Sequence, residues 1–285
     1  MKLVSYADGA GPRCGILEAG AIVDLPYPSW PAAFASWDAV RPDLDRALAA
    51  RAVVRPLATA RLLPPVRPGA IYCAAANYRD HFREMTPGRE PPDRATTRPY
   101  FFTKVPSTII GPDEAIRLPA TSEQVDWEAE IAVVIGRPCR GATLADALSH
   151  VAGYTIINDL SARDLSARED WPLFGTDWFS GKSFDTSAPL GPAITLAEDV
   201  PDPHALSIRT WVNETLHQDS RSSEMLFSIP ELIVALSAQL TLQPGDVIAT
   251  GTPAGCGRPR GIYLRPGDVV TIEIERLGVL RNPVV

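Results

Sequence analysis

Short segments in which hydrophobic and polar residues alternate, and others that are almost wholly hydrophobic, recur along the chain. Alternation at every second position is typical of half-buried strands, and a short apolar run is typical of a strand in a core. The strands predicted from these patterns are residues 2–6, 14–20, 21–25, 70–78, 100–105, 114–119, 126–136, 153–159, 246–253 and 268–280. Turns with glycine or proline separate these strands and leave little room for long helices.

Helical spacing of hydrophobic positions is found in four segments. They are residues 42–54, 78–85, 142–151 and 228–242. We expect Asn77, Thr143 and Ser228 to cap the last three helices, and Glu231 stands at capping-box spacing from Ser228. Because the helices are inserted irregularly among the strands, a Rossmann or TIM-barrel architecture is disfavoured. We predict a mainly β protein of the α+β class.

Composition changes along the chain in a way that predicts two domains. Residues 1–63 combine short strands with one helix and are predicted to form a small N-terminal α+β domain. Residues 64–69 (PPVRPG) are predicted to be a linker because prolines and a glycine dominate them. Residues 70–285 then form the larger domain. Within it, residues 86–99 are polar and proline-rich and are predicted to be a long loop, either a lid or a disordered segment.

Charge and cysteine content exclude several classes of protein. The chain has 34 acidic and 27 basic residues and a net charge of −7, so we expect it to bind neither nucleic acid nor an anionic membrane. No apolar stretch approaches the ~20 residues of a membrane helix, and the N-terminal residues do not resemble a signal peptide. The cysteines form no CxxC pair, so we expect buried, reduced thiols in a cytoplasmic protein. They are Cys14, Cys73, Cys139 and Cys256.

Two acidic residues interrupt the most apolar of the predicted strands. Glu128 and Glu130 are two positions apart, so their side chains share one face of the strand, roughly 6.5–7 Å apart along it. Two like charges on a core strand are destabilising unless something compensates them, and a divalent cation would do so. The alternative is a solvated strand edge, where the pair would be harmless.

Asp159 follows the apolar strand at residues 153–159 and is a candidate third ligand. Its alternative role is that of a helix N-cap. Three carboxylates with water would make an all-oxygen site. Such a site is typical of Mg²⁺ or Mn²⁺, with Ca²⁺ as a further candidate, rather than of Zn²⁺.

His81 and Glu84 are three residues apart in a predicted helix and therefore neighbours on its surface. A carboxylate beside an imidazole orients it and raises its basicity, which suits a general base. The alternative is a surface ion pair on a charged helix. The remaining histidines are expected to be structural or exposed; they are His150, His204 and His217.

Three further residues are candidates for binding an anionic substrate. Lys182 lies in a predicted loop. Its ammonium group either binds an anionic substrate or is only solvated. Arg163 offers the planar fork that binds a carboxylate. Thr252 lies on a Gly/Pro turn after a strand, where free backbone N–H groups can bind an anion, although an ordinary turn has the same composition.

The order of these motifs resembles that of the fumarylacetoacetate hydrolase superfamily from about Ala70 to the C-terminus. The matching stretches are NYRDHFREM, PYFFTKVPSTIIGP, VDWEAEIAVVIG, GYTIINDLSARD, GKSFDTSAPLGP and PGDVIATGTPAG. The resemblance implies a mixed β-sandwich roll with few helices, usually in a homodimer. Residues 1–63 likewise resemble the small N-terminal domain of many bacterial members.

The resemblance also implies a role for each motif. It assigns the metal to Glu128, Glu130 and Asp159. It assigns the activation of water to His81 with Glu84, on a segment that orders over bound substrate.

Around the substrate, the resemblance places Lys182 near the reacting carbonyl. It places Arg163 and Thr252 at the carboxylate end of the substrate. Lys104 and Ser107 match a loop that borders the site.

The implied activity is that of a metal-dependent hydrolase, which cleaves a C–C bond in an acylpyruvate-type 2-oxo acid through activated water and a pyruvate enolate. Oxaloacetate decarboxylation and hydroxy-dienedioate isomerisation are alternatives on the same site, and a catalytically idle metal-binding homologue is another. One departure leaves the reaction open. Many members have glutamine two residues after SARD, where this chain has Ser166. The aromatic loop at residues 168–179 either forms an apolar wall of the pocket or only packs.

Overall fold

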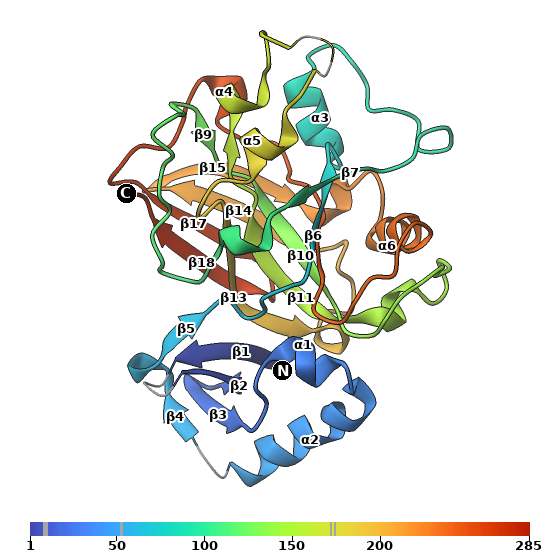
Figure 1. The fold of residues 1–285 in the computed structure, drawn as a ribbon, viewed down its shortest axis with the longest axis vertical. Helices are drawn as coiled ribbons and strands as arrows, with labels where there is room; N and C mark the ends of the chain where they lie inside the picture. The colour runs from blue at the N-terminus through green and yellow to red at the C-terminus, as the bar shows by residue number, and fades with distance from the viewer. Residues whose placement is uncertain (8–10, 52–53, 172, 174) are drawn as a thin grey trace.

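A computed structural model describes residues 1–7, 11–51, 54–171, 173 and 175–285. Within these residues the largest sheet has twelve strands, in the order β4-β3-β2-β1-β13-β11-β10-β16-β6-β7, with β5 on β1 and β8 on β13 (Figure 1). A second sheet has the order β15-β14-β17-β18, and β12 pairs with β9. The prediction of a mainly β protein with few helices is confirmed.

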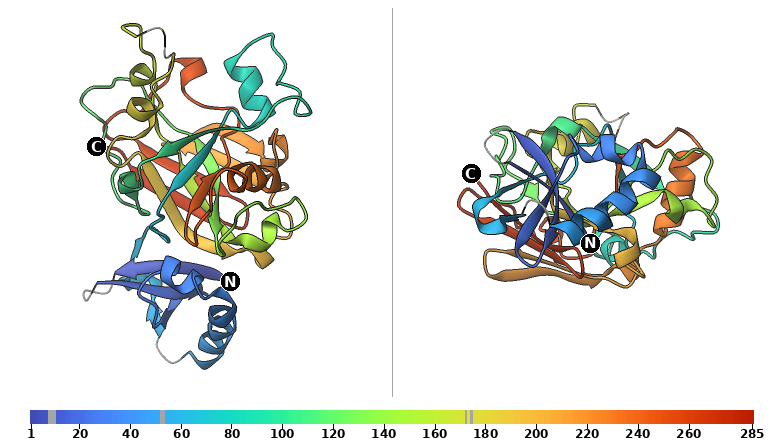
Figure 2. Two further views of the ribbon diagram at one scale, coloured as in Figure 1. Left: turned by 45° about the vertical axis from the view of Figure 1, so that its right-hand side comes forward. Right: turned by 90° about the horizontal axis from the view of Figure 1, so that it is seen from below.

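The first five strands and two helices form the N-terminal part of the chain. They are β1 (Lys2–Ala7), β2 (Pro12–Glu18), β3 (Ala21–Leu25), α1 (Trp30–Phe34), α2 (Trp37–Ala50), β4 (Val54–Pro56) and β5 (Arg61–Leu63). Figures 1 and 2 show them at one end of the molecule, opposite α3. β1 pairs with β13 of the following part, so one sheet runs through both. Residues 64–69 form neither helix nor strand. The two-domain division stays a prediction.

The strands that follow form the centre of the molecule. They are β6 (Ile71–Ala75), β7 (Tyr100–Lys104), β8 (Ile109–Ile110), β9 (Val125–Asp126), β10 (Ala129–Ile135), β11 (Val151–Asn158), β12 (Ser161–Ala162), β13 (Ala188–Leu196) and β16 (Val247–Ala249). Every residue of β10 and β11 is buried. Parallel pairs (β16 with β6, β13 with β8) among antiparallel ones make the sheet mixed.

The second sheet covers one face of this centre. It consists of β14 (Ser207–Val212), β15 (Thr215–Arg221), β17 (Val269–Ile274) and β18 (Gly278–Pro283). Buried residues of both sheets share one core, in which Ile131 and Ile156 of the first sheet belong with Ile208 and Ile272 of the second. The two layers therefore form the sandwich that the resemblance implied. None of the helices in the described ranges is long and apolar enough to cross a membrane.

Four short helices complete the larger part of the chain: α3 (Arg79–Met85), α4 (Arg163–Ser166), α5 (Trp178–Lys182) and α6 (Ile229–Ser237). The predicted capping box of α6 is present, with Ser228 as the N-cap and Glu231 bonding back to it. The N-cap residue of α3 is Tyr78 and not Asn77. Instead, the Asn77 amide joins two other segments: it donates to the carbonyls of Phe227 and Thr250 and accepts the Phe227 N–H.

Two helix predictions need new boundaries. The first helix spans Trp37–Ala50 with Pro42 inside it, and it ends where Arg51 takes a left-handed conformation; residues 52–53 lie outside the described residues. The last helix ends at Ser237, not at residue 242.

Four predicted elements are wrong or incomplete. Residues 268–280 form no single strand, because the chain turns after Ile274 and β17 and β18 pair as an antiparallel hairpin. Residues 142–151 form only the short 3₁₀ turn Ala147–His150, because the Thr143 N–H is bound by the Asp146 carboxylate and β11 already begins at residue 151. Residues 114–119 form a single bridge and no strand, because the Asn282 amide binds the Glu114 carbonyl at the start of this segment. Residues 126–136 are broken between β9 and β10.

Candidate functional site

Three carboxylates meet where two buried strands of the large sheet begin and end. Glu130 lies on β10, Asp159 follows directly after β11, and Glu128 lies in the break between β9 and β10. One carboxylate oxygen of each lies within 4.8 Å of those of the other two, and all three residues are buried. The structure therefore brings together the three residues that the sequence suggests as metal ligands. We call them the carboxylate cluster.

Two buried lysines lie against the carboxylate cluster. Lys182 Nζ is 2.6 Å from Glu128 Oε2 and 2.7 Å from Asp159 Oδ2. Lys104 Nζ is 2.7 Å from Asp159 Oδ1. The sequence places Lys182 in a loop, but it is the last residue of α5, a helix that the Asp177 side chain caps. Lys104 is likewise the last residue of β7 and not part of a bordering loop.

The charges of the three carboxylates are compensated unequally. Burial alone would raise the pKa of Glu128, but Lys182 and Arg163 hold that pKa well below its usual range. Burial, followed by the charges of Asp159 and Glu128, raises the pKa of Glu130 well above its usual value. A divalent cation would supply the compensation that Glu130 needs. An all-carboxylate donor set fits Mg²⁺ or Mn²⁺, so the residues present suit the predicted cation.

The guanidinium of Arg163 is bound by acidic side chains of the chain itself. Its Nε and Nη2 donate to Asp126 Oδ2 at 3.0 and 2.8 Å, and Nη2 donates to Glu128 Oε1 at 2.6 Å. Asp126 also accepts the N–H groups of Gly257 and Arg258. Arg163 lines the pocket, but its fork holds Glu128 in place. Sequence reasoning missed Asp126, whose one signal is its place in the motif VDWEAE.

The dyad His81 and Glu84 lies on α3. His81 is buried, and its Nδ1 is 3.8 Å from Glu84 Oε2. Glu84 accepts the Gly255 N–H at 2.9 Å and pairs with Arg260 at 3.0 Å. Burial would raise the pKa of Glu84, but His81 and these two contacts hold that pKa below its usual value. Glu84 is therefore ionised at neutral pH, as a carboxylate that orients an imidazole must be.

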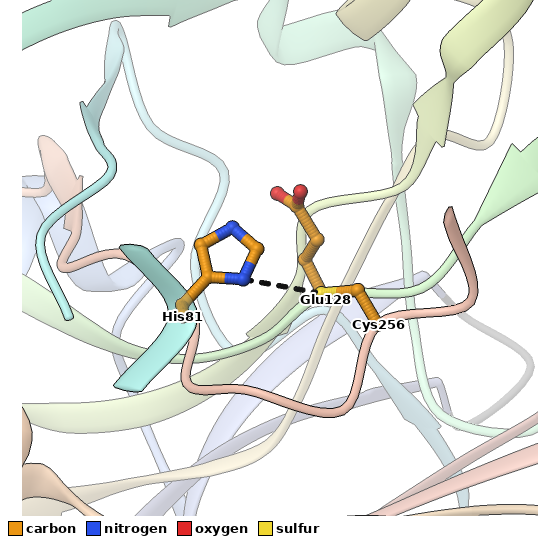
Figure 3. A group of neighbouring side chains, drawn as sticks. All are labelled: His81, Glu128 and Cys256. Carbon is orange, nitrogen blue, oxygen red and sulfur yellow. Dashed lines mark hydrogen bonds between the residues drawn. The ribbon is translucent and has the colours of Figure 1, made fainter. Parts of the chain in front are cut away.

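Cys256 lies beside the dyad, a position that sequence reasoning missed. Its Sγ is 3.9 Å from His81 Nδ1, and Figure 3 shows the thiol and the imidazole pointing toward each other beside Glu128. The expectation of buried thiols is met, since all four cysteines are buried and free. The available signal for Cys256 was its place in ATGTPAGCG, four residues after Thr252.

The turn that carries Thr252 binds groups of the chain itself. The Thr252 hydroxyl donates to the Ala129 carbonyl and accepts from the Gln218 amide. The N–H that binds a carboxylate there belongs to Gly251, which donates to Glu130 Oε2 at 2.7 Å. Thr252 still lines the pocket.

Three predicted substrate contacts lie outside the pocket lining, and one of them is Lys104, whose side chain is fully buried against Asp159. Ser107 is exposed on the 3₁₀ turn Pro106–Thr108. The Ser166 hydroxyl donates to the Ala162 carbonyl, and a Cβ at Gly181 would meet it at 1.9 Å. The lack of a side chain at Gly181 therefore lets α5 pack closely against Ser166 of α4.

The pocket in front of the carboxylate cluster has a volume of about 230 Å³. Phe82, Phe102 and Trp178 line it, and Trp178 stacks on Phe102 with ring centres 4.7 Å apart. The aromatic loop at residues 168–179 thus supplies one wall residue, while Trp171 is exposed and residues 172 and 174 lie outside the described residues.

The remaining histidines and the predicted lid lie around the site. His204 accepts the N–H of Ile229 at the start of α6, which is a structural role. His217 lies against Trp127, with ring centres 4.6 Å apart. The loop at residues 86–99 is mostly exposed and is tied to α6 by an ion pair between its Arg94 and Glu231. Closure of this loop over a substrate stays a prediction.

Known proteins match this chain along its whole length. A mitochondrial oxaloacetate tautomerase of Bos taurus is 40% identical over 298 residues, which cover 100% of this chain and 92% of that protein. The solved 5-carboxymethyl-2-hydroxymuconate delta-isomerase of Mycobacterium smegmatis is 33% identical, with a TM-score of 0.80. The maleylpyruvate hydrolase of Sphingobium sp. SYK-6, solved with manganese(II) and pyruvate, is 30% identical, with a TM-score of 0.80. Both alignments cover 100% of this chain and 99% of the solved one.

The family comparison agrees with the order of the motifs. The fumarylacetoacetate (FAA) hydrolase C-terminal family matches residues 70–285. These residues hold the carboxylate cluster, the dyad and both lysines. The chain therefore belongs to the fumarylacetoacetate hydrolase superfamily of enzymes.

Proposed function

We propose that the chain is a divalent-metal-dependent enzyme that moves a proton at C3 of a small 2-oxo dicarboxylic acid of the oxaloacetate type, and so interconverts its keto and enol forms. The observation that carries this proposal is the dyad beside the carboxylate cluster in a pocket of about 230 Å³. Pockets for larger ligands commonly have volumes of about 300–1,000 Å³, so this one suits a four-carbon substrate.

Glu128, Glu130 and Asp159 would hold the metal as oxygen ligands. When bound, Mg²⁺ or Mn²⁺ supplies Lewis-acid polarisation of the 2-oxo and carboxylate oxygens, which acidifies the neighbouring C–H.

His81 takes the proton from C3 and delivers it to the 2-oxo oxygen to give the enol, and the reverse transfer gives the keto form, since an imidazole can act as both general base and general acid. Glu84 acts through His81 by orienting the ring. Lys182 contributes positive charge close to the oxygen on which negative charge develops.

Arg258 supports the choice of a dicarboxylic acid. It lines the pocket and is exposed, and within the described ranges its guanidinium has no ion-pair partner. A planar guanidinium at the rim suits a carboxylate at the far end of a substrate. The similar proteins support the same class, since oxaloacetate, maleylpyruvate and 5-carboxymethyl-2-hydroxymuconate all carry more than one carboxylate.

C–C hydrolysis of an acylpyruvate-type 2-oxo acid is the second candidate. The similarity to maleylpyruvate hydrolase favours it. Hydrolysis also needs a positioned water, and the glutamine that contacts substrate or water in many superfamily members is replaced here by Ser166, whose hydroxyl donates to the Ala162 carbonyl. Tautomerisation by proton transfer needs no positioned water. Oxaloacetate decarboxylation and hydroxy-dienedioate isomerisation remain alternatives with the same metal and enolate chemistry.

A substrate panel tests the proposal. The enol-to-keto conversion of oxaloacetate is followed by its absorbance with Mg²⁺, Mn²⁺ or EDTA, after subtraction of the uncatalysed rate. Pyruvate release is measured in parallel from oxaloacetate, maleylpyruvate and a simple acylpyruvate. We expect EDTA-sensitive acceleration of the tautomerisation without pyruvate release. Metal-dependent pyruvate release from an acylpyruvate with no effect on tautomerisation would instead establish the hydrolase. Pyruvate release from oxaloacetate alone would establish a decarboxylase.

The assembly and the location of the protein are further proposals. The family resemblance supports a homodimer, and the absence of a basic segment in the sequence supports a protein without a nucleic-acid partner. We retain the cytoplasmic location as a prediction from the reduced cysteines, to be tested by fractionation of cells.

A further inference from the structure

A second group of metal-ligating side chains shares Glu128 with the carboxylate cluster. One ligand atom each of His81, Glu128 and Cys256 lies within 4.8 Å of those of the other two. Figure 3 shows the imidazole and the thiol facing each other, with the carboxylate of Glu128 beside them. All three residues are buried, and Cys256 has no solvent exposure. These contacts form a compact set and not a lone thiol.

The chemistry of this second set differs from that of the first. The carboxylate cluster offers oxygen alone, which Mg²⁺ and Mn²⁺ prefer. The second set offers one nitrogen, one sulfur and one oxygen, which are the three donor types that Zn²⁺ takes in proteins. A thiolate ligand also favours Zn²⁺ strongly over Mg²⁺. The two adjacent ligand sets are therefore suited to different cations.

Glu128 can serve the second set despite its existing contacts. Oε1 accepts from Arg163 and Oε2 accepts from Lys182, one donor for each oxygen. A carboxylate oxygen has two lone-pair sites, so each oxygen keeps one for a cation. Three protein ligands with water as the fourth then complete the tetrahedral shell that Zn²⁺ commonly takes in catalytic sites.

We propose that His81, Glu128 and Cys256 form a second cation site, which takes Zn²⁺ while Mg²⁺ is present. Binding forms bonds from the cation to one ring nitrogen of His81, to one Glu128 oxygen and to Cys256 Sγ. The thiol proton passes to the solvent, and no electron is transferred. If His81 is the base, bound Zn²⁺ also stops turnover. That consequence alone rests on the proposed function, and the binding site does not.

Equilibrium dialysis of the full chain tests the site directly. The protein is saturated with Mg²⁺ and dialysed against Zn²⁺, and both metals are then measured. We expect one equivalent of Zn²⁺ to bind with Mg²⁺ retained. Cys256→Ser should weaken zinc binding by at least about 100-fold, because loss of an outer partner alone costs about 10–100-fold. Cys139→Ser, which alters another buried thiol, should leave zinc binding unchanged. Glu130→Gln should lose Mg²⁺ and keep Zn²⁺.

Cobalt gives a second readout that does not depend on activity. Co²⁺ bound to a thiolate shows a ligand-to-metal charge-transfer band in the near ultraviolet. We expect this band in the wild type and in Cys139→Ser, and its loss in Cys256→Ser, with circular dichroism showing that each variant is folded. The wild-type spectrum needs no variant and alone refutes the site if the band is absent. Unchanged zinc affinity in folded Cys256→Ser, or zinc uptake matched by equal release of Mg²⁺, would equally refute it.

Discussion

The carboxylate cluster and His81 of the dyad line one pocket, but different parts of the fold hold them. Glu130 lies on β10 and Asp159 lies directly after β11, and these two strands form a buried pair at the centre of the large sheet. His81 and Glu84 belong to α3, a helix of seven residues outside that sheet. The proposed metal ligands are thus fixed by the core, whereas the residues proposed to move protons depend on a few polar contacts. We therefore expect binding and turnover to be separable by mutation.

The largest effect on metal binding and turnover should come from a substitution in the carboxylate cluster. Glu130→Ala removes a ligand and should abolish Mg²⁺ binding and lower turnover by at least about 10³-fold, because Lewis-acid stabilisation is worth several kcal/mol. Calorimetric titration with Mg²⁺ and the tautomerisation rate measure the two losses. Glu123→Ala, at an exposed glutamate, is the control. Full Mg²⁺ affinity in Glu130→Ala would show that the carboxylate cluster is not the metal site.

Substitution of the dyad on α3 should reduce turnover without reducing metal binding. His81→Ala should lower kcat by about 10²- to 10⁴-fold, the usual contribution of a general base, with Mg²⁺ affinity unchanged within about 2-fold. His150→Ala, at a histidine on the 3₁₀ turn before β11, serves as the matched control. A large fall in Mg²⁺ affinity in His81→Ala would show that metal binding and turnover are not separable in this way.

Arg258 tests which substrates the pocket selects. Arg258→Ala should raise KM for oxaloacetate by about 10-fold, near the lower end for loss of a hydrogen bond to a charged group, because the residue is exposed. The kcat should change little, and a 2-oxo acid with one carboxylate should be unaffected. An equal rise in KM for both substrates would show that Arg258 does not bind the second carboxylate.

The smallest effect concerns the contacts that hold α3. The pKa of Glu84 is lower in the folded protein than its usual value, so its charge stabilises the fold above the unfolded pKa, and this contribution disappears as pH falls through the folded value. Glu84→Gln should lower the free energy of unfolding by about 1 kcal/mol at pH 7. The gap to the wild type should close in strongly acidic solution. Urea unfolding at several pH values measures it, and a gap that grows on acidification would contradict the assignment.

The buried half of the site could be predicted well from the sequence, because its signal is local. Acidic residues inside an apolar segment, such as Glu128 and Glu130, can be recognised from a few consecutive residues of the sequence. The same rule failed for β13, which is almost wholly buried yet contains Pro189 and Pro192. It also failed for β15, where Gln218 is the one buried residue, so no hydrophobic alternation marks the strand.

The contacts around the dyad could not be predicted, because they join segments far apart in the sequence. Cys256 contacts His81 only because the turn after β16 folds back to α3. The spacing of hydrophobic residues in the sequence does not predict this contact. Asp126 meets Arg163 through the pairing of β9 with β12. Asn77 was expected as a cap from its local sequence, whereas its partners lie 150 and 173 residues away.

The position of Lys182 has a consequence for the life of the protein before it meets a metal. Its ammonium lies between Glu128 and Asp159, within 2.7 Å of an oxygen of each. The polypeptide thus carries its own counterion for two of its buried carboxylates. A newly synthesised chain would therefore not need the proposed cation to complete its sandwich, and loading of that cation would be a late, reversible step that follows folding.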